Sequence, residues 1–179
     1  MVKNILITGG AGYIGAHVTE ILLKKNRNVF LIDNLSTGHR KLINSKAKFF
    51  KIDIKNKQKV KKIIEKYKID SIIHLAANLI IGEGERKPNK YYKNNVLGTK
   101  KLLDACKGTT IKNFIFSSTA AIYKEGQYKV SESSVKKPKS VYGKTKLKAE
   151  KIIKSFAKKN NINYGILRYF NIAGSSPSG

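Results

Sequence analysis

The sequence predicts an α/β protein built on a doubly wound parallel sheet of about six strands, with helices on both faces of the sheet. Short apolar runs alternate along the chain with amphipathic stretches whose apolar residues recur at helical spacing. The short runs are almost wholly apolar, which is typical of strands that are covered on both faces. Strands that alternate with helices in this way are the pattern of a parallel sheet.

Each element follows from its local pattern. The first run, residues 4–8, is short and β-branched and ends in glycines, so we interpret it as a buried strand. Val60, Ile63 and Ile64 share one face of a helix, and Pro88 suits the first position of another. The predicted strands are 4–8, 28–33, 48–54, 70–77 with its exit loop, 112–118 and 163–170, and the predicted helices are 13–25, a segment around 60–67, 88 to about 107, and 141–159.

Length and composition restrict the class of protein. The 179 residues, 41% of them hydrophobic, are enough for one domain with its own core, which we assign to residues 1–179. No apolar run approaches the ~18 residues of a membrane-spanning helix, and the N-terminus lacks the apolar stretch of a signal peptide. The single cysteine, Cys106, excludes a disulfide framework and a cysteine zinc site within one chain. We therefore expect a soluble cytoplasmic protein with no membrane partner.

The formal net charge of +26 raises the question of a nucleic-acid partner. The basic residues are 33 lysines and only 4 arginines, whereas recognition of bases and phosphates also draws on arginine forks. The lysines are spread from end to end and are not gathered in one stripe. We interpret the charge as a composition of the solvated surface and predict no nucleic-acid binding.

A glycine-rich segment after the first strand predicts a phosphate-binding loop. Gly10, Gly12 and Gly15 satisfy the pattern G-x-G-x-x-G, and Gly9, Gly12 and Gly15 satisfy the looser G-x-x-G-x-x-G. Glycine permits the tight turn and lets the backbone approach a pyrophosphate. The free N–H groups at the start of the following helix then bind the phosphates. The segment lies between a predicted strand and a predicted helix, which makes the pattern Rossmann-like.

An acidic residue at the end of the second strand indicates which dinucleotide binds. Asp33 comes 18 residues after Gly15. A carboxylate there accepts hydrogen bonds from the adenosine ribose and repels a 2′-phosphate, which favours NAD over NADP. Asp53 and Ile54 end the third strand, where they are placed to border the adenine.

The second motif with a chemical meaning is Tyr142-x-x-x-Lys146. Residues four apart on a helix share a face, so the phenol and the ammonium group can point into one site. A nearby lysine cation favours the phenolate, and we expect it to bring the pKa of Tyr142 toward that of a useful base. The fifth strand ends in Ser117, Ser118 and Thr119, whose hydroxyls lie at the edge of the sheet where ligands bind in this fold. Together these groups form a proton-relay set for an alcohol and a carbonyl.

Two other reactive side chains receive structural interpretations. His74 has no second histidine or cysteine at ligand spacing, so we predict that it supports the end of the fourth strand. Cys106 lies on an apolar helix face, and we predict that it belongs to the core. No metal site is predicted.

These segments resemble the extended short-chain dehydrogenase/reductase family, and within it the 4-epimerases of UDP-sugars. The resemblance covers essentially the whole chain. The segments that carry it are 8–15, 33–35, 53–54, 74–77, 94–99, 116–123, 142–146 and 168–171.

The resemblance implies roles for individual residues. The catalytic set would be Thr119, Tyr142 and Lys146, with Asn171 reaching the nucleotide-sugar together with Thr119 and Tyr142. The residues implied to bind the cofactor are Gly9, Gly12, Tyr13, Ile14 and Gly15 at the pyrophosphate, Asp33, Asn34, Leu35, Ser36, Thr37 and Gly38 around the ribose, Asp53 and Ile54 at the adenine, Leu75, Ala76, Ala77 and Leu79 along its middle, and Asn94, Tyr142, Lys146 and Phe170 toward the nicotinamide.

The activity that the resemblance implies is the interconversion of UDP-glucose and UDP-galactose by transient oxidation at C4, with tightly held NAD. Chains of this family are nearly twice as long, so the resemblance also implies that a C-terminal substrate domain is missing. The family pairs as homodimers through helices near 90–107 and 141–159. Two residues depart from the family: Thr119 stands where serine is frequent, and Leu79 stands where some members carry a lysine.

Several alternatives stay open at this point. The sugar could be UDP-glucuronate or a UDP-N-acetylhexosamine, or the chain could be a non-catalytic NAD-binding fragment. Nucleotide-sugar 4,6-dehydratases are similar to this pattern but need an acidic pair beside the catalytic hydroxyl, where this chain has Ala120 and Ala121.

Overall fold

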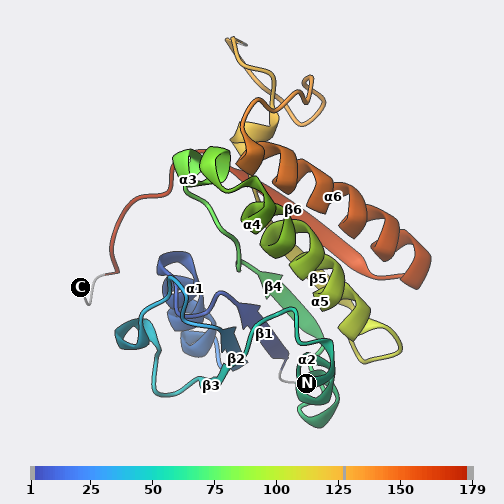
Figure 1. The fold of residues 1–179 in the computed structure, drawn as a ribbon. Helices are drawn as coiled ribbons and strands as arrows, with labels where there is room; N and C mark the ends of the chain where they lie inside the picture. The colour runs from blue at the N-terminus through green and yellow to red at the C-terminus, as the bar shows by residue number, and fades with distance from the viewer. Residues whose placement is uncertain (1–2, 127, 177–179) are drawn as a thin grey trace.

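The six predicted strands form one parallel sheet in the order β3-β2-β1-β4-β5-β6 (Figure 1). The computed structural model describes residues 3–126 and 128–176. In chain order the elements are β1 (Asn4–Thr8), α1 (Tyr13–Lys24), β2 (Asn28–Asp33), the 3₁₀-helix η1 (Arg40–Leu42), β3 (Lys48–Lys51), α2 (Lys57–Lys66), β4 (Ser71–His74), α3 (Ile81–Arg86), α4 (Pro88–Tyr91), the π-helix η2 (Tyr92–Gly98), α5 (Thr99–Cys106), β5 (Asn113–Thr119), the 3₁₀-helix η3 (Ala120–Ile122), α6 (Val141–Asn160) and β6 (Asn163–Tyr169).

The direction in which strands are added reverses at β1. From β1 the chain adds β2 and β3 on one side, and then returns to add β4, β5 and β6 on the other. Because such crossovers are right-handed, the reversal places α1 on one face of the sheet and α2, α5 and α6 on the opposite face. A crevice forms outside the carboxyl ends of β1 and β4, where ligands bind in doubly wound sheets. The predicted fold class is confirmed.

Each face of the sheet has its own apolar core, because alternate side chains of a strand point to opposite faces. In β1, Leu6 belongs to the larger core, which includes Phe114 of β5 and Ile153 of α6. Ile5 and Ile7 belong to the smaller core, against which α1 packs. Burial on both faces is the reason why these strands are nearly continuous apolar runs.

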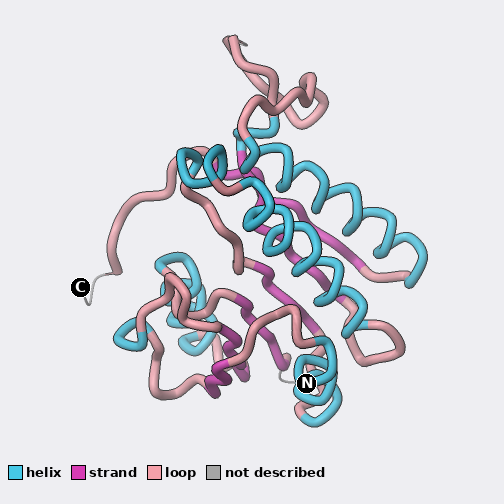
Figure 2. Tube along the Cα trace, viewed as in Figure 1, coloured by secondary structure: helices cyan, strands magenta, loops and turns pink. Residues whose placement is uncertain are grey.

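The helix predicted from Pro88 to about residue 107 is one helical run with a π-helical turn in its middle. Asn95 lies in that turn and forms two hydrogen bonds with the backbone of Asn78: its Oδ1 accepts from the N–H (2.8 Å) and its Nδ2 donates to the carbonyl (2.9 Å). The Nδ2 group also donates to the Thr145 hydroxyl of α6 (3.2 Å). The turn therefore ties the long loop after β4, visible in Figure 2, to α6.

Two elements differ clearly from the sequence prediction. The third strand ends at Lys51 rather than at residue 54, because Asp53 begins a turn in which its Oδ1 accepts from the N–H of Lys55 (2.8 Å). Helix α3 was not predicted, since Gly82 and Gly84 interrupt the helical pattern in a six-residue segment.

The lysines lie on the outside, as the composition suggested. Among the lysines in the part of the chain that the structure describes, Lys146 is the only one that is buried. No helix in that same part is both long enough and apolar enough to cross a membrane. This buried lysine lies near the carboxyl edge of the sheet, beside the end of β5.

Candidate active site

The glycine-rich loop is held against the chain that leaves β4. Gly9 adopts φ +73°, and a Cβ atom there would lie 2.7 Å from the backbone nitrogen of Ala76, so only glycine fits. A side chain at Gly15 would collide with the carbonyl oxygen of Gly9. Gly12 is the N-cap of α1, and no side chain caps the helix. The first N–H groups of α1 are thus left without a side-chain partner, as a phosphate-binding helix requires.

The carboxylate of Asp33 is fixed at the rim of the same crevice. Its Oδ2 accepts from the backbone N–H of Ala11 (3.1 Å), and its Oδ1 accepts from the N–H of Leu35 (2.7 Å). The residue is only 9% exposed. Beside it, the Asn34 side chain donates to Asp53 Oδ2 (3.2 Å). These bonds order the loop after β2 around one carboxylate.

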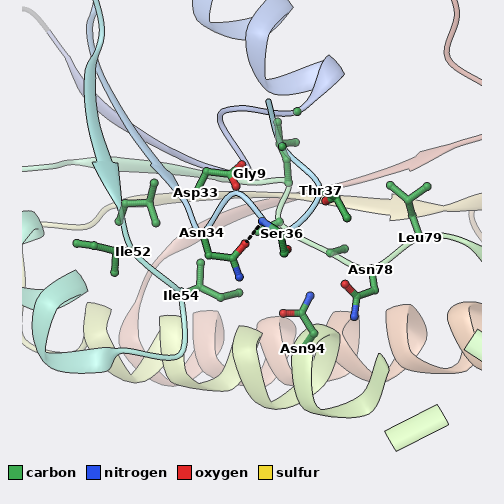
Figure 3. Close-up of a pocket in the computed structure, with 16 residues that line it drawn as sticks. Gly9, Asp33, Asn34, Ser36, Thr37, Ile52, Ile54, Asn78, Leu79 and Asn94 are labelled. Atoms are coloured by element: carbon green, nitrogen blue, oxygen red, sulfur yellow. Dashed lines mark hydrogen bonds between the residues drawn. The ribbon is translucent and has the colours of Figure 1, made fainter. Parts of the chain in front are cut away.

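The cofactor pocket, as we call this part of the crevice, lies between the loop after β2 and the loop after β4. Figure 3 shows Asp33 and Asn34 at one end of it, with Asn78 and Asn94 approaching from the loop after β4 and from η2. The lining residues are Gly9, Gly12, Ile32, Asp33, Asn34, Ser36, Thr37, Gly38, Ile52, Ile54, Leu75, Ala76, Ala77, Asn78, Leu79 and Asn94.

Helix α6 begins at the other end of the crevice. Its N-cap, Ser140, accepts from the N–H of Gly143 (3.0 Å), and Glu85 of α3 accepts from the N–H of Val141 (2.7 Å). These caps fix the first turn of α6, which carries Tyr142. Lys146 follows one turn later on the same face.

Thr119 and Tyr142 are in contact at the carboxyl end of β5. The Oγ1 of Thr119 accepts from the N–H of Ala121 (3.1 Å), which leaves its proton free for the Tyr142 oxygen. Burial raises the pKa of Tyr142, and the hydrogen bond from Thr119 opposes that effect. The expectation that Lys146 lowers the pKa of Tyr142 is therefore wrong for this structure, because desolvation of the phenol is the larger effect.

Lys146 is almost fully buried, although it borders the crevice. The residue is 2% exposed, and its Nζ lies 4.4 Å from the centroid of the Phe116 ring. Burial lowers the pKa of Lys146 to about 7, and the negative charge of Glu150 opposes that effect. Its charge is therefore poised to change near neutral pH.

His74 supports the end of β4, as predicted. Its Nδ1 forms a hydrogen bond with the Thr8 hydroxyl (2.7 Å), and its Nε2 forms one with the Thr99 hydroxyl (2.9 Å). Burial and, secondarily, the Lys146 cation lower the pKa of His74 to about 3, so the ring is neutral. Cys106 is a buried core residue, and burial raises the pKa of its thiol to about 12. Within residues 3–126 and 128–176, no three metal-ligating side chains come together.

The reaction pocket, as we call the cavity over Tyr142, adjoins the cofactor pocket. The two share Leu75, Ala77 and Leu79 as lining residues. Among the described residues, none that lines the reaction pocket carries a carboxylate. Its lining residues are Tyr13, Ile14, Leu75, Ala77, Leu79, Ile81, Ser117, Ser118, Thr119, Ala120, Ala121, Tyr142, Lys146, Tyr169, Phe170, Asn171 and Ile172.

Most of the predicted site residues thus line one of two adjoining pockets. Three do not line either pocket: Gly15 packs under the loop, Leu35 supports Asp33, and Asp53 pairs with Asn34. The sequence interpretation did not select Ile32, Ile52 and Asn78 of the cofactor pocket, nor Glu150 of α6. Glu150 was detectable, since it continues the four-residue spacing from Tyr142 and Lys146.

Comparisons with known proteins agree with this geometry. Residues 5–179 match the model of the NAD dependent epimerase/dehydratase family. A UDP-glucose 4-epimerase from Lactobacillus helveticus is 43% identical over 98% of this chain and 54% of its own length. The structure of a Brucella ovis UDP-glucose 4-epimerase in complex with NAD is similar, with a TM-score of 0.95 and 38% identity over 99% of this chain and 55% of that one. The UDP-Glc/GlcNAc 4-epimerase from Campylobacter jejuni gives a TM-score of 0.91 and 40% identity, over 97% and 55%.

The chain spans about half the length of the curated relatives that it matches. The sequence motifs had predicted this resemblance, and its extent over nearly all of the chain confirms it.

The neutral state of His74 predicts a loss of stability in acid. The pKa of His74 is about 3 in the folded chain, against 6.5 without the fold, so the unfolded chain binds this proton more tightly. Stability from this residue is complete above about pH 6.5 and falls as the pH drops toward 3. We expect a loss of about 2 kcal/mol between pH 7 and pH 5, measured by urea unfolding at both pH values.

His74→Gln removes this titration, so the variant should lose about 2 kcal/mol less than the unaltered chain over the same interval. His39→Gln, at an exposed histidine, is the matched control and should behave like the unaltered chain. An equal loss in His74→Gln and the unaltered chain would contradict the assignment.

Proposed function

The chain belongs to the NAD dependent epimerase/dehydratase family, and on that premise we propose that it is the cofactor-binding and proton-transferring part of a UDP-sugar 4-epimerase. The proposed reaction interconverts UDP-glucose and UDP-galactose. The observation that carries the proposal is the contact of Thr119 with Tyr142, one helical turn from Lys146, where the reaction pocket adjoins the cofactor pocket.

The cofactor pocket suits NAD. The glycine loop leaves space where side chains would collide, and the N-terminus of α1 has no side-chain cap. The fixed carboxylate of Asp33 matches a ribose with free hydroxyls and disfavours a 2′-phosphate. When bound, NAD supplies the group that accepts a hydride from C4 of the sugar and returns it.

The side chains of the reaction pocket then transfer one proton. Tyr142 would take the proton of the sugar 4-hydroxyl during oxidation at C4 and would return it to the oxygen during reduction of the keto sugar. Thr119 donates a hydrogen bond to the same centre, which stabilises the phenolate. Lys146 supplies the positive charge behind the pair. Proton and hydride are both returned, so the reaction is an isomerisation.

The composition of the reaction pocket favours epimerisation over dehydration. Dehydration of a 4-keto sugar requires a side-chain acid and base beside the hydroxyl, and Ala120 and Ala121 occupy those positions. The similarity to the Campylobacter jejuni UDP-Glc/GlcNAc 4-epimerase supports UDP-N-acetylglucosamine as a second substrate to assay; UDP-glucuronate is the third. A chain that binds NAD without turnover is the alternative that the activity measurements test.

Turnover is the first test, and it needs a chain of the relatives' length. We propose to join residues 1–179 to the part of the Lactobacillus helveticus enzyme that this chain does not span. Tyr142→Phe should lower the rate of UDP-galactose conversion by about 10²- to 10⁴-fold, because the base is lost. Tyr164→Phe removes an exposed phenol of β6 that lines neither pocket and is the matched control, with an unchanged rate expected.

An unaffected rate in Tyr142→Phe would reject Tyr142 as the base. Residues 1–179 alone should bind NAD and fail to convert UDP-galactose, because we assign much of the sugar site to the remaining half. Conversion by residues 1–179 at the rate of the joined protein would refute that assignment.

Cofactor choice is the second test. Asp33→Asn removes the charge that disfavours a 2′-phosphate, so NAD should bind about tenfold more weakly and the preference over NADP should shrink. Calorimetric titration of residues 1–179 with each dinucleotide measures both. Asp104→Asn, at a surface ion pair with Lys107, should change neither affinity. Equal binding of NAD and NADP by the unaltered chain would contradict the role of Asp33.

We also propose, from the family resemblance, that the protein forms a homodimer through the run of α4, η2 and α5 together with α6. The helix η2 leaves Tyr92 (38%) and Leu97 (41%) exposed. Light scattering on residues 1–179 should give about twice the chain mass at micromolar concentration. A monomer mass at every concentration tested would contradict the dimer.

A further inference from the structure

A buried ion pair lies one turn beyond Lys146 on α6. Glu150 is 1% exposed and forms a two-point contact with Arg168 of β6: Nε donates to Oε1 (3.1 Å) and Nη2 donates to Oε2 (2.9 Å). The hydroxyl of Ser118 in β5 donates to the same Oε1 (2.5 Å). One carboxylate thus connects α6, β5 and β6.

The connection falls directly beside the reacting groups. Tyr142, Lys146 and Glu150 are spaced four residues apart, so they follow one face of α6. Ser118 immediately precedes Thr119, the partner of Tyr142. A shift of α6 along the sheet would therefore break the bonds of Glu150 and the contact of Tyr142 with Thr119 together.

Glu150 also sets the charge around Lys146. Glu150 on the same helix acts on the ammonium group of Lys146, the Lys146 cation in turn acts on neutral His74 of β4, and Arg168 of β6 is paired with Glu150. Lys146 makes no hydrogen bond among the described residues; its contact is the ring of Phe116. Glu150 is thus the nearby negative charge that favours the protonated amine against burial.

We propose that Glu150 is a positioning residue of this site: it supplies a buried negative charge one turn from the Lys146 ammonium group, and it holds α6 in register with β5 and β6 so that Tyr142 meets Thr119. The link between Glu150 and catalysis rests on the proposed function. The effect of Glu150 on the charge state of Lys146 can be measured without turnover.

The experiment is an NMR titration of residues 1–179 labelled at lysine Cε. The resonance of Lys146 is assigned by its loss in Lys146→Arg. Glu150→Gln keeps the shape of the side chain and removes its charge, while Arg168 keeps its own. The loss of the negative charge and the unbalanced positive charge of Arg168 both disfavour a protonated Lys146. We therefore expect the affinity of Lys146 for its proton to fall about tenfold or more.

Two controls separate the charge from a general structural effect. Ser118→Ala removes the hydrogen bond to Glu150 but no charge, and Glu65→Gln makes the same substitution at an exposed carboxylate of α2. Both should leave the titration of Lys146 within about twofold of the unaltered chain. An unchanged titration in folded Glu150→Gln would overturn the proposal.

A second pair of variants covers the case in which Glu150→Gln does not fold because Arg168, whose side chain is 12% exposed, loses its carboxylate partner. Arg168→Met should raise the proton affinity of Lys146, since a cation is removed and the charge of Glu150 is no longer balanced. Glu150→Gln combined with Arg168→Met should lower it again relative to Arg168→Met alone. Equal titrations in these two variants would overturn the proposal, whereas loss of epimerase activity alone would bear only on the proposed function.

Discussion

The reversal of strand order between β1 and β4 is the constraint on which the rest of this structure depends. It separates the loop after β1 from the loop after β4 and opens the crevice that both pockets share. The glycine at position 9 lets the two loops touch at the base of that crevice. The same reversal places α1 on one face and α6 on the other, so the helix after the glycine-rich loop and the helix that carries Tyr142 and Lys146 approach the crevice from opposite sides.

Most of the fold could be predicted from sequence because each strand carries its own signal. A strand buried on both faces must be apolar throughout, and the runs at residues 4–8 and 28–33 match β1 and β2 residue for residue. The prediction was weaker where the backbone follows side-chain hydrogen bonds. In the π-helical turn, Asn95 forms hydrogen bonds with Asn78, 17 residues earlier in the chain. A local sequence pattern does not predict such a contact.

In the candidate site, too, features with a local sequence signal were predicted, and features that depend on contacts between distant residues were not. Motif spacing found Tyr142 and Lys146 and placed three hydroxyls near them, those of Ser117, Ser118 and Thr119; the family resemblance then selected Thr119. Motif spacing misjudged the pKa of Tyr142, since the direction depends on how far the phenol is desolvated, which spacing does not reveal. It also passed over Glu150, whose meaning appears only when Arg168 and Ser118 arrive from two other strands.

Burying charged and polar side chains near the carboxyl edge of the sheet costs free energy of desolvation. Lys146, His74 and Glu150 are each almost fully buried, and the free energy of desolvating such groups is recovered only when every partner is in place. Lys146 lines the reaction pocket, Glu150 follows it one turn later on α6, and the Lys146 cation acts on His74. By contrast, Phe170 (72% exposed) and Leu79 (65%) line that pocket with largely exposed side chains. Tyr142 and Thr119 thus lie between a buried network of polar and charged groups and a rim of exposed apolar side chains. For the proposed 4-epimerase, this arrangement would keep the proton-transferring groups fixed while a keto sugar turns over beside the rim.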